Sequence, residues 1–257
     1  MKLCATVCTY NRPHLLPRVI ASFEAQNYED RCMLIYDDGG QYDNQSGDGG
    51  RWFLVSEKTR QCSLGAKRNI SIKFALDYFP NLDAILPCDD DDMFLPWHFT
   101  SAAKALENAD WSRPSVILSP VVIGDSWIFM QNYTGTRADQ TIQRLYHPAW
   151  AMKIGFVLAA GGYPNDQNTG EDQALMRKLE HFGAKQADPI ELGFRPSYIY
   201  CWGNDNISGM ITRGDPSGLA AWKNLKKPLK HAELSKWSFP FNPNNPVMSP
   251  CVYQRPF

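Results

Sequence analysis

The chain has 257 residues, of which 44% are hydrophobic, so it can bury a sizeable core as one large domain or as one domain with an appendage. It contains no apolar run of the roughly 18 residues that a membrane span needs, and its N-terminus enters a strand-like pattern instead of a signal peptide's apolar core, so we expect a soluble, cytoplasmic protein. The net charge of −1 at pH 7 excludes an overall electrostatic attraction to nucleic acid or membrane.

The first part of the chain alternates strand-like and helix-like segments. Residues 2–9 predict a strand, and apolar residues then recur at helical spacing after Pro13 up to about Gln26. A second strand is expected at 32–36, and the polar, glycine-rich residues 41–50 are typical of a loop. Four further segments are then expected in order, namely a strand at 52–55, a helix at 64–79 ended by Pro80, a strand at 83–88 and a helix at 97–108.

The second part of the chain is less regular. Runs at 116–123, 126–130 and 141–145 indicate a change to antiparallel pairing. After them we expect helices at 154–160 and 171–182, a strand at 196–201 and an irregular, proline-rich tail at 239–257. The alternation as a whole predicts an α/β fold with a mostly parallel, doubly wound sheet, whose ligands bind beyond the carboxyl ends of the strands.

Four consecutive aspartates, at positions 89–92, follow the predicted strand at 83–88. Unit charges about 4 Å apart repel each other by roughly 4 kcal/mol at an effective dielectric constant of 20, so such a cluster favours a divalent cation as its partner. A solvated acidic turn and a helix N-terminus, where aspartates complement the dipole, are the alternatives. Asp37, at the end of the second strand, is expected on the same edge of the sheet as Asp89.

Five motifs in one order give the chain a resemblance to a known family. They are Thr9-Tyr10-Asn11-Arg12-Pro13, Asp37-Asp38-Gly39, Gly65-Ala66-Lys67-Arg68-Asn69, Asp89-Asp90-Asp91-Asp92 with Leu95-Pro96, and Gly161-Gly162-Tyr163 followed by Gly170-Glu171-Asp172. In this order the chain resembles the GT-A fold, family 2-like inverting glycosyltransferases over roughly residues 3 to 210. The resemblance implies a doubly wound mixed sheet in one Rossmann-like domain over 1–212, with a basic and then proline-rich extension at 213–257.

The resemblance also implies a site for a nucleotide-diphosphate sugar, with a UDP-sugar favoured. In such enzymes the first-loop tyrosine, here Tyr10, stacks on the base, and the carboxylate after the second strand, here Asp37, accepts from the imide N–H of the base. Alternatives are that Tyr10 is a core residue at the rim and that Asp37 forms a turn. Lys67 is interpreted as a surface residue. The implied nucleotide-sugar-binding residues are Thr9, Tyr10, Arg12, Asp37, Arg68, Asp89 and Asp90.

The family's D-x-D phase aligns Asp89 with the ribose-binding carboxylate and Asp91 with the metal ligand. Hard oxygen ligands suit Mn²⁺ or Mg²⁺. Many relatives carry a further metal-side histidine, but the corresponding segment here has none. Asn206 is the second predicted ligand, and the alternatives are Asp205 or a metal held only by Asp91 and the donor's phosphates. A metal held this weakly is expected to arrive with the donor.

The resemblance places the general base for the acceptor hydroxyl at the start of the helix predicted at 171–182. Asp172 is the predicted base and Glu171 the second choice. The alternative for both is helix capping, because acidic residues in a first turn complement the helix dipole.

Two other functions remain open from the sequence. A non-catalytic nucleotide-sugar or glycan-binding module would lack the base, although both acidic residues are present. A nucleotidyltransferase would show a basic, glycine-rich loop after the first strand, which is absent. The acceptor is a glycan, a lipid-linked intermediate or a nucleic acid, and the lysine-rich stretch from Lys223 to His231 raises modified DNA as one option beside a solvated helix face.

Overall fold

The computed structural model of the protein describes residues 1–123, 126–133, 147–201 and 228–230, and side chains only outside 119–146 and 202–257. The strand predicted at 141–145, the predicted ligands Asp205 and Asn206 and nearly all of the predicted extension at 213–257 lie outside these ranges. None of the helices in the described part of the chain has the length and apolar composition needed to cross a bilayer.

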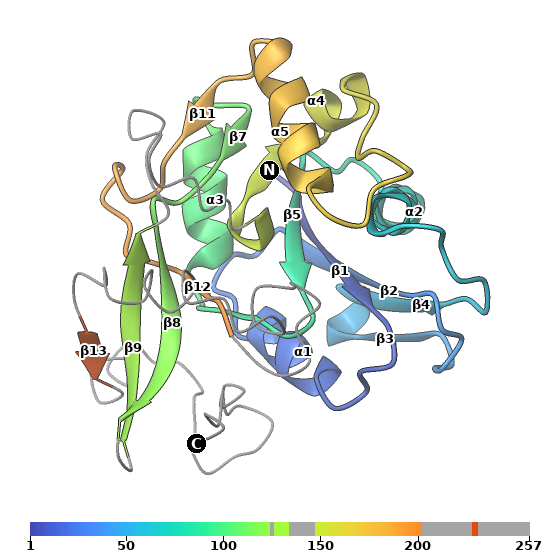
Figure 1. Cartoon of the computed structure of the whole chain (residues 1–257), viewed down its shortest axis with the longest axis horizontal. Helices are drawn as coiled ribbons and strands as arrows, with labels where there is room; N and C mark the ends of the chain where they lie inside the picture. Colours follow the sequence, from blue (N-terminus) through green and yellow to red (C-terminus); the bar gives the residue numbers. More distant parts are fainter. Residues whose placement is uncertain (124–125, 134–146, 202–227, 231–257) are drawn as a thin grey trace.

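The helices are α1 (Leu16–Glu24), α2 (Leu64–Tyr78), α3 (His98–Leu106), α4 (Ile154–Ala159) and α5 (Glu171–His181), with 3-10 turns at Asp48–Gly50 and His147–Ala149. The strands are β1 (Leu3–Thr9), β2 (Arg31–Asp37), β3 (Gln45–Gly47), β4 (Trp52–Ser56), β5 (Ala84–Asp89), β6 (Met93–Phe94), β7 (Trp111–Ser112), β8 (Val116–Ile123), β9 (Ser126–Tyr133), β10 (Ala151–Lys153), β11 (Gln186–Ala187), β12 (Tyr198–Ile199) and β13 (Pro228–Lys230). Figure 1 shows their arrangement.

Most of the predicted elements begin and end close to the predicted residues, with three differences, and the short strands β6, β7, β10, β11 and β13 were not predicted. The first helix begins at Leu16 because a separate turn, in which the Leu15 amide donates to the Arg12 carbonyl at 3.1 Å, comes first. The predicted loop at 41–50 contains β3, which pairs with β4. The predicted strand at 196–201 keeps ladder pairing only over β12.

The main sheet has eight strands in the order β11-β7-β10-β5-β1-β2-β4-β3. Strands β5, β1, β2 and β4 are parallel neighbours, while β10 and β3 pair antiparallel at either side of them. The predicted doubly wound mixed sheet is therefore confirmed. A second sheet, with the order β13-β9-β8-β12-β6, contains the predicted antiparallel pair β8 and β9.

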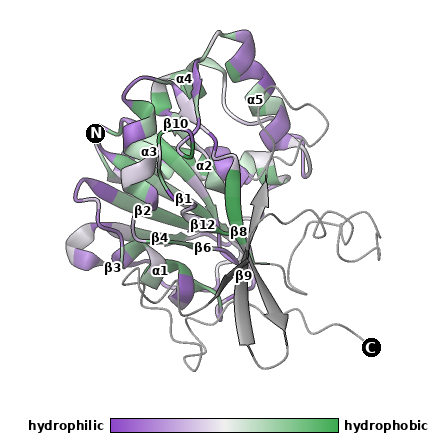
Figure 2. Cartoon of the chain, turned by 90° about the vertical axis from the view of Figure 1, so that its left-hand side faces the viewer, coloured by the Kyte–Doolittle hydropathy of each residue, from purple (hydrophilic) through white to green (hydrophobic). Residues whose placement is uncertain are grey.

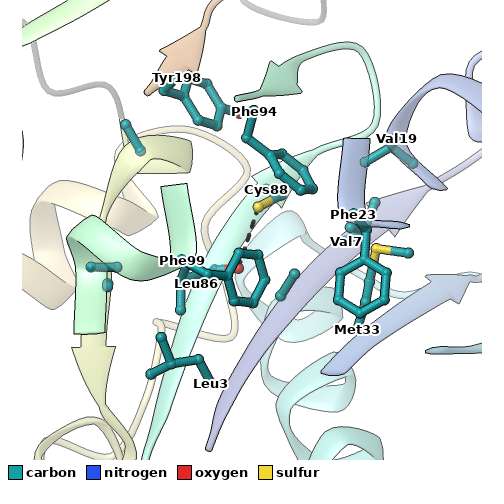
Figure 3. Packing of buried hydrophobic residues seen from close by; sticks show 14 of the residues in the cluster. Leu3, Val7, Val19, Phe23, Met33, Leu86, Cys88, Phe94, Phe99 and Tyr198 are labelled. Carbon is teal, nitrogen blue, oxygen red and sulfur yellow. Dashed lines mark hydrogen bonds between the residues drawn. The ribbon is translucent and has the colours of Figure 1, made fainter. Parts of the chain in front are cut away.

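Helices cover both faces of the parallel strands because successive residues of a strand point to opposite faces. On β1, Leu3, Ala5 and Val7 belong to the core shared with α1 and α3, whereas Cys4 belongs to a second core against α2. Figure 3 shows the first of these cores around Phe99. In Figure 2 hydrophobic residues lie along the central strands, and hydrophilic residues are prominent on the outer helix α5.

Candidate active site

Three parallel strands end at one edge of the sheet and deliver the predicted site residues there. The register pairs Thr9 with Asp37 and Cys8 with Asp89, so the last residues of β1, β2 and β5 are neighbours. The predicted meeting of Asp37 and Asp89 at the carboxyl edge of the sheet is confirmed. We call this edge, with the loops that follow each of the three strands, the rim.

The four aspartates after β5 divide into two kinds. The carboxylates of Asp90 and Asp92 accept hydrogen bonds from partners within the protein. Asp90 accepts hydrogen bonds from Thr9 Oγ1 and from Arg12 Nη1, both at 2.7 Å. Asp92 is fully buried and accepts from the Tyr198 hydroxyl at 2.8 Å and from the backbone amide of Cys201 at 2.7 Å. Asp90, predicted to bind the nucleotide sugar, therefore lies in the site with its carboxylate holding Thr9 and Arg12 in place.

Asp89 and Asp91 are less fully matched. The Asp89 side chain is 34% exposed, and the Arg68 guanidinium is 3.3 Å from its Oδ1. Asp91 is 8% exposed, and its carboxylate lies 3.2 Å from Arg12 Nη1, a nitrogen that Asp90 holds more closely. Burial and then the charges of Asp89 and Asp90 raise the pKa of Asp91 to about 7. The carboxylate is therefore destabilised in its charged form, which a divalent cation would reverse.

The residues fit a divalent cation. One carboxylate oxygen from each of Asp89, Asp91 and Asp92 can be chosen so that all three lie within 4.8 Å of one another. Asp92 already accepts two hydrogen bonds, so Asp89 and Asp91 are the better-placed ligands. Oxygen donors alone suit Mn²⁺ or Mg²⁺.

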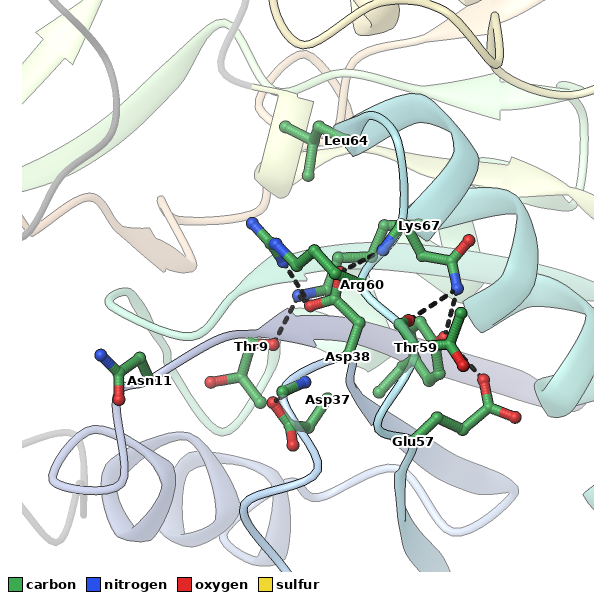
Figure 4. Close-up of polar contacts among 12 residues, drawn as sticks. Thr9, Asn11, Asp37, Asp38, Glu57, Thr59, Arg60, Leu64 and Lys67 are labelled. Carbon is green, nitrogen blue, oxygen red and sulfur yellow. Dashed lines mark hydrogen bonds and ion pairs between the residues drawn. The ribbon is translucent and has the colours of Figure 1, made fainter.

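On the other side of the rim, a charge-matched cluster surrounds Tyr10. Tyr10 is 44% exposed, and the guanidinium carbon of Arg60 lies 3.7 Å from the centroid of its ring. Arg60 also forms an ion pair with the buried Asp38, as does Lys67, each at 2.5 Å, and Figure 4 shows both cations converging on this carboxylate. The prediction that Lys67 is a surface residue is wrong, because it is only 5% exposed and also donates to the Thr9 carbonyl.

Asp37, predicted to accept from the base, is fully buried. Its carboxylate holds the loop that follows β2 by accepting from the amides of Gly39 and Gln41, at 3.0 and 3.1 Å, and from the Ser56 hydroxyl at 2.7 Å. The turn-forming role is thus present in the structure. Base recognition by Asp37 stays a prediction, and it requires this loop to open.

Arg68 joins the aspartates to the helix that carries the predicted base. Its Nε is 3.3 Å from Glu171 Oε1, and its Nη2 is 3.3 Å from Asp89 Oδ1. Arg68 is 7% exposed, contrary to the alternative of an ordinary exposed helical arginine. Asp172, next to Glu171 in the first turn of α5, is partly exposed, and its Oδ1 accepts from the neighbouring Gln173 amide at 2.8 Å.

The two acidic residues in the first turn of α5 therefore differ. Glu171 is 5% exposed and is tied to Arg68, whereas Asp172 makes no ion pair among the residues that the structure describes. Burial is the largest cause raising the pKa of each, and Arg68 opposes that effect at both. A carboxylate with a raised pKa that is open to a ligand is suited to accept a proton near neutral pH.

Asn69 positions the loop that leads into α5, a role that the sequence did not indicate. Its side chain accepts from the Tyr163 amide at 2.9 Å and donates to the Tyr163 carbonyl at 2.8 Å. Gly162 has a φ of 66°, and a Cβ atom there would come within 2.5 Å of Asn69 Oδ1. A side chain at position 162 would therefore displace the Asn69 side chain from the position in which it holds this loop. His147 donates to or accepts from the Tyr163 hydroxyl at 2.7 Å and is a buried packing residue.

This sheet and rim are those of the GT-A fold, the fold of a large class of glycosyltransferases. The chain is similar to the crystal structure of S. aureus TarS 1–349 in complex with UDP-GlcNAc, with a TM-score of 0.59 and 16% identity over 80% of this chain and 60% of TarS 1–349. It is also similar to the mannosyltransferase PcManGT from Pyrobaculum calidifontis in complex with GDP-Man and Mn²⁺, with a TM-score of 0.50 and 17% identity over 77% of this chain and 56% of that one.

A relative in sequence belongs to the same class. The chain is 26% identical over 176 residues to the uncharacterized glycosyltransferase YwdF of Bacillus subtilis, and the match covers 63% of this chain and 62% of that protein. No protein-family model matches the chain. The chain thus spans less than two thirds of the length of each of these relatives. The resemblance to GT-A glycosyltransferases that the motifs indicated is confirmed, and the family 2-like, inverting character stays a prediction.

Proposed function

We propose that this protein is a metal-dependent, inverting glycosyltransferase that moves one sugar from a nucleotide-diphosphate sugar, with a UDP-sugar favoured, to a hydroxyl group of an acceptor. The observation that carries the proposal is the Arg68 bridge, which ties Asp89 at the end of β5 to Glu171 at the start of α5. It holds a cluster of carboxylates suited to a cation beside a helix that offers a base. The UDP-GlcNAc complex of TarS and the GDP-Man and Mn²⁺ complex of PcManGT support this kind of donor.

The donor would lie along the rim. Tyr10 offers an exposed ring for stacking the base, and Asp89, the most exposed of the four aspartates, is placed to accept from the ribose hydroxyls. Thr9 and Arg12 act through Asp90, which they hold in place. Arg68 balances the charge of Asp89 and would lie beside the diphosphate.

Asp91 and Asp89 would hold the cation, with the donor's phosphates completing its ligands and Asn206 as the predicted further one. When bound, Mn²⁺ or Mg²⁺ would offset the negative charge that develops on the departing nucleoside diphosphate. Of these two carboxylates, Arg12 compensates Asp91 when the cation is absent, since its Nη1 contacts both Asp90 and Asp91.

Asp172 is the proposed base. It takes the proton of the acceptor hydroxyl as the hydroxyl oxygen forms a bond to the anomeric carbon from the face opposite the leaving group. The bond between the anomeric carbon and the diphosphate oxygen breaks in the same step, and its electron pair leaves with the diphosphate. One displacement of this kind inverts the anomeric configuration. Glu171 is engaged in orienting Arg68, and its carboxylate is less exposed than that of Asp172. For both reasons Asp172 is preferred as the base.

The acceptor is proposed only by class, as a glycan, a lipid-linked intermediate or a nucleic acid. The lysine-rich stretch from Lys223 to His231, which raised modified DNA as an option, lies almost wholly outside the described residues. A cytoplasmic location is likewise part of the proposal.

A screen of nucleotide sugars by thermal shift, with and without Mn²⁺, tests the proposal. We expect one UDP-sugar to raise the melting temperature only when Mn²⁺ is present, because ligands that bind the folded state stabilise it. The stabilising sugar is then incubated with candidate acceptors, and Asp172→Asn should keep the donor-induced shift while losing transfer. No shift with any nucleotide sugar would contradict the proposal, and a shift without any transfer or donor hydrolysis would favour a binding module.

A further inference from the structure

The cluster around Tyr10 contains a residue to which the proposed reaction assigns no role. Arg60 stands in the loop between β4 and α2, and its guanidinium carbon lies 3.7 Å from the centroid of the Tyr10 ring. This distance is well within the range of a cation–π contact. The guanidinium lies over the ring, and 44% of the Tyr10 residue is still exposed.

Arg60 is fixed in this position although its own side chain is 53% exposed. Its Nη1 forms an ion pair with Asp38, whose side chain is fully buried. Asp38 is fixed in turn by Lys67 Nζ, at 2.5 Å, and by the backbone amide of Gln61, at 3.0 Å. Burial alone would raise the pKa of Asp38, but these partners outweigh it and hold the pKa below its ordinary value. The carboxylate is therefore a firm, charged anchor for the guanidinium.

The loop after β2 and Lys67 also lie near the ring. A Cβ atom at Gly39 would approach Tyr10 Cδ2 to 3.2 Å, and Lys67 Nζ lies 5.8 Å from the ring centroid, farther away than Arg60. Because 44% of the Tyr10 residue is still exposed, it offers open surface on which a planar group can stack. Pre-ordering a side chain in this way lowers the cost of immobilising it when a ligand binds.

We propose, resting on the function proposed above, that Arg60 is a positioning residue for the nucleotide base. Anchored on Asp38, it backs one face of the Tyr10 ring and presents the opposite face to the base of a nucleoside diphosphate. Arg60 acts through Tyr10 and does not itself contact the base. The set of Asp38, Arg60 and Tyr10 thus determines how firmly the base end of the donor is held.

A double-mutant cycle tests this proposal. The affinity for UDP in the presence of Mn²⁺ is measured by calorimetry for wild type, Arg60→Ala, Tyr10→Ala and the double variant, with inorganic pyrophosphate as a second ligand that lacks the base. We expect Arg60→Ala to weaken UDP binding about tenfold and to leave pyrophosphate binding unchanged. In the Tyr10→Ala background the same change should alter UDP affinity less than twofold, because a residue that acts through another shows non-additive effects.

Controls keep the outcomes distinct. Arg51→Ala, which removes an arginine at the opposite end of β4 that pairs with Glu29, should leave UDP affinity unchanged. Arg60→Lys, which keeps the charge but not the planar group, should weaken UDP binding by less than Arg60→Ala, and melting curves check that each variant is folded. An equal loss in both backgrounds, an equal loss of UDP and pyrophosphate, or no loss at all would overturn the role of Arg60. If wild type binds no nucleoside diphosphate, the proposed function fails and the role of Arg60 fails with it.

Discussion

The two sides of the rim solve the problem of buried charge in opposite ways. Around Tyr10, the buried Asp38 has two cationic partners at 2.5 Å, and its pKa is held below the ordinary value. After β5, four aspartates follow one another, and burial raises the pKa of Asp90 and Asp92 as well as that of Asp91. One side is complete without a ligand, and the other carries more negative charge than its arginines neutralise.

This difference indicates where binding of a ligand stabilises the protein most. A charge-matched cluster gains little from a further ion, so the Tyr10 side is suited to shape and stacking. A cluster with raised pKa values favours anything that brings positive charge. The proposed function uses both sides of the rim. The base of the donor lies on the Tyr10 side, and a cation lies on the aspartate side.

The largest effect is expected from removing Asp91, the predicted metal ligand. Asp91→Asn should lower the rate of sugar transfer or donor hydrolysis in Mn²⁺ by about a thousandfold, which corresponds to about 4 kcal/mol of transition-state stabilisation. Initial rates over a range of Mn²⁺ concentrations give the measurement. Asp77→Asn, an exposed position on α2, is the matched control and should keep full activity. Undiminished activity of Asp91→Asn would remove Asp91 from the metal site.

Stability should show the opposite order. Asp38→Asn leaves Lys67 buried beside a neutral partner and should lower the free energy of unfolding by about 3 kcal/mol. Asp91→Asn removes one of several crowded charges and should be neutral or stabilising by up to about 1 kcal/mol in metal-free protein at pH 8. Urea denaturation of both variants measures the contrast, with Asp77→Asn as the reference. A greater loss in the free energy of unfolding for Asp91→Asn than for Asp38→Asn would contradict this contrast between the two sides of the rim.

The strands that carry the two sides of the rim could be predicted from the sequence, but the partners of the charged residues there could not. The strands that end at Thr9, Asp37 and Asp89 were predictable, because period and β-branched content identify parallel strands whose carboxyl ends converge. The D-x-D phase also separated Asp89 and Asp91 from their two neighbours, and the structure shows the same alternation. The roles of Asp89 at the ribose and of Asp91 at the metal stay predictions.

The partners of the charges could not be predicted. Lys67 was interpreted as a surface residue, since nothing in its helical neighbourhood shows that the first turn of α2 enters the rim and meets Asp38, 29 residues earlier. The same holds for Arg60 on Tyr10 and for Asn69 on Tyr163, whose contacts depend on how separate elements pack. Pair identity between distant residues is a property of the packed fold, so one sequence alone does not contain a local signal for it.

Metal binding on the aspartate side of the rim should depend on pH through Asp91. Burial and the charges of Asp89 and Asp90 raise the pKa of Asp91 to about 7, above its value of about 4 in the unfolded chain. Its proton therefore contributes stability that is complete below about pH 4 and is lost as the pH rises through about 7. A cation replaces that proton, so stabilisation by Mn²⁺ should increase by about 1 kcal/mol between pH 6 and pH 8.

Melting temperatures with and without Mn²⁺ at pH 6, 7 and 8 give this dependence. In Asp91→Asn the stabilisation by Mn²⁺ should be small and nearly independent of pH. A stabilisation of wild type that weakens as the pH rises would contradict the assignment of Asp91 as the group that exchanges its proton for the metal.

The smallest effect concerns the hydroxyl that compensates Asp90. Thr9→Val keeps the shape of the side chain but removes the donor to Asp90 Oδ2 at 2.7 Å, and it should lower the free energy of unfolding by about 1 kcal/mol. Thr100→Val removes a hydroxyl that donates to Asn27 at the same distance at an exposed site, where water replaces the lost bond, so its effect should be smaller. Equal losses in urea denaturation would mean that Asp90 keeps its full compensation from Arg12 alone. The aspartate side of the rim would then depend on its arginines as fully as the Tyr10 side depends on Arg60 and Lys67.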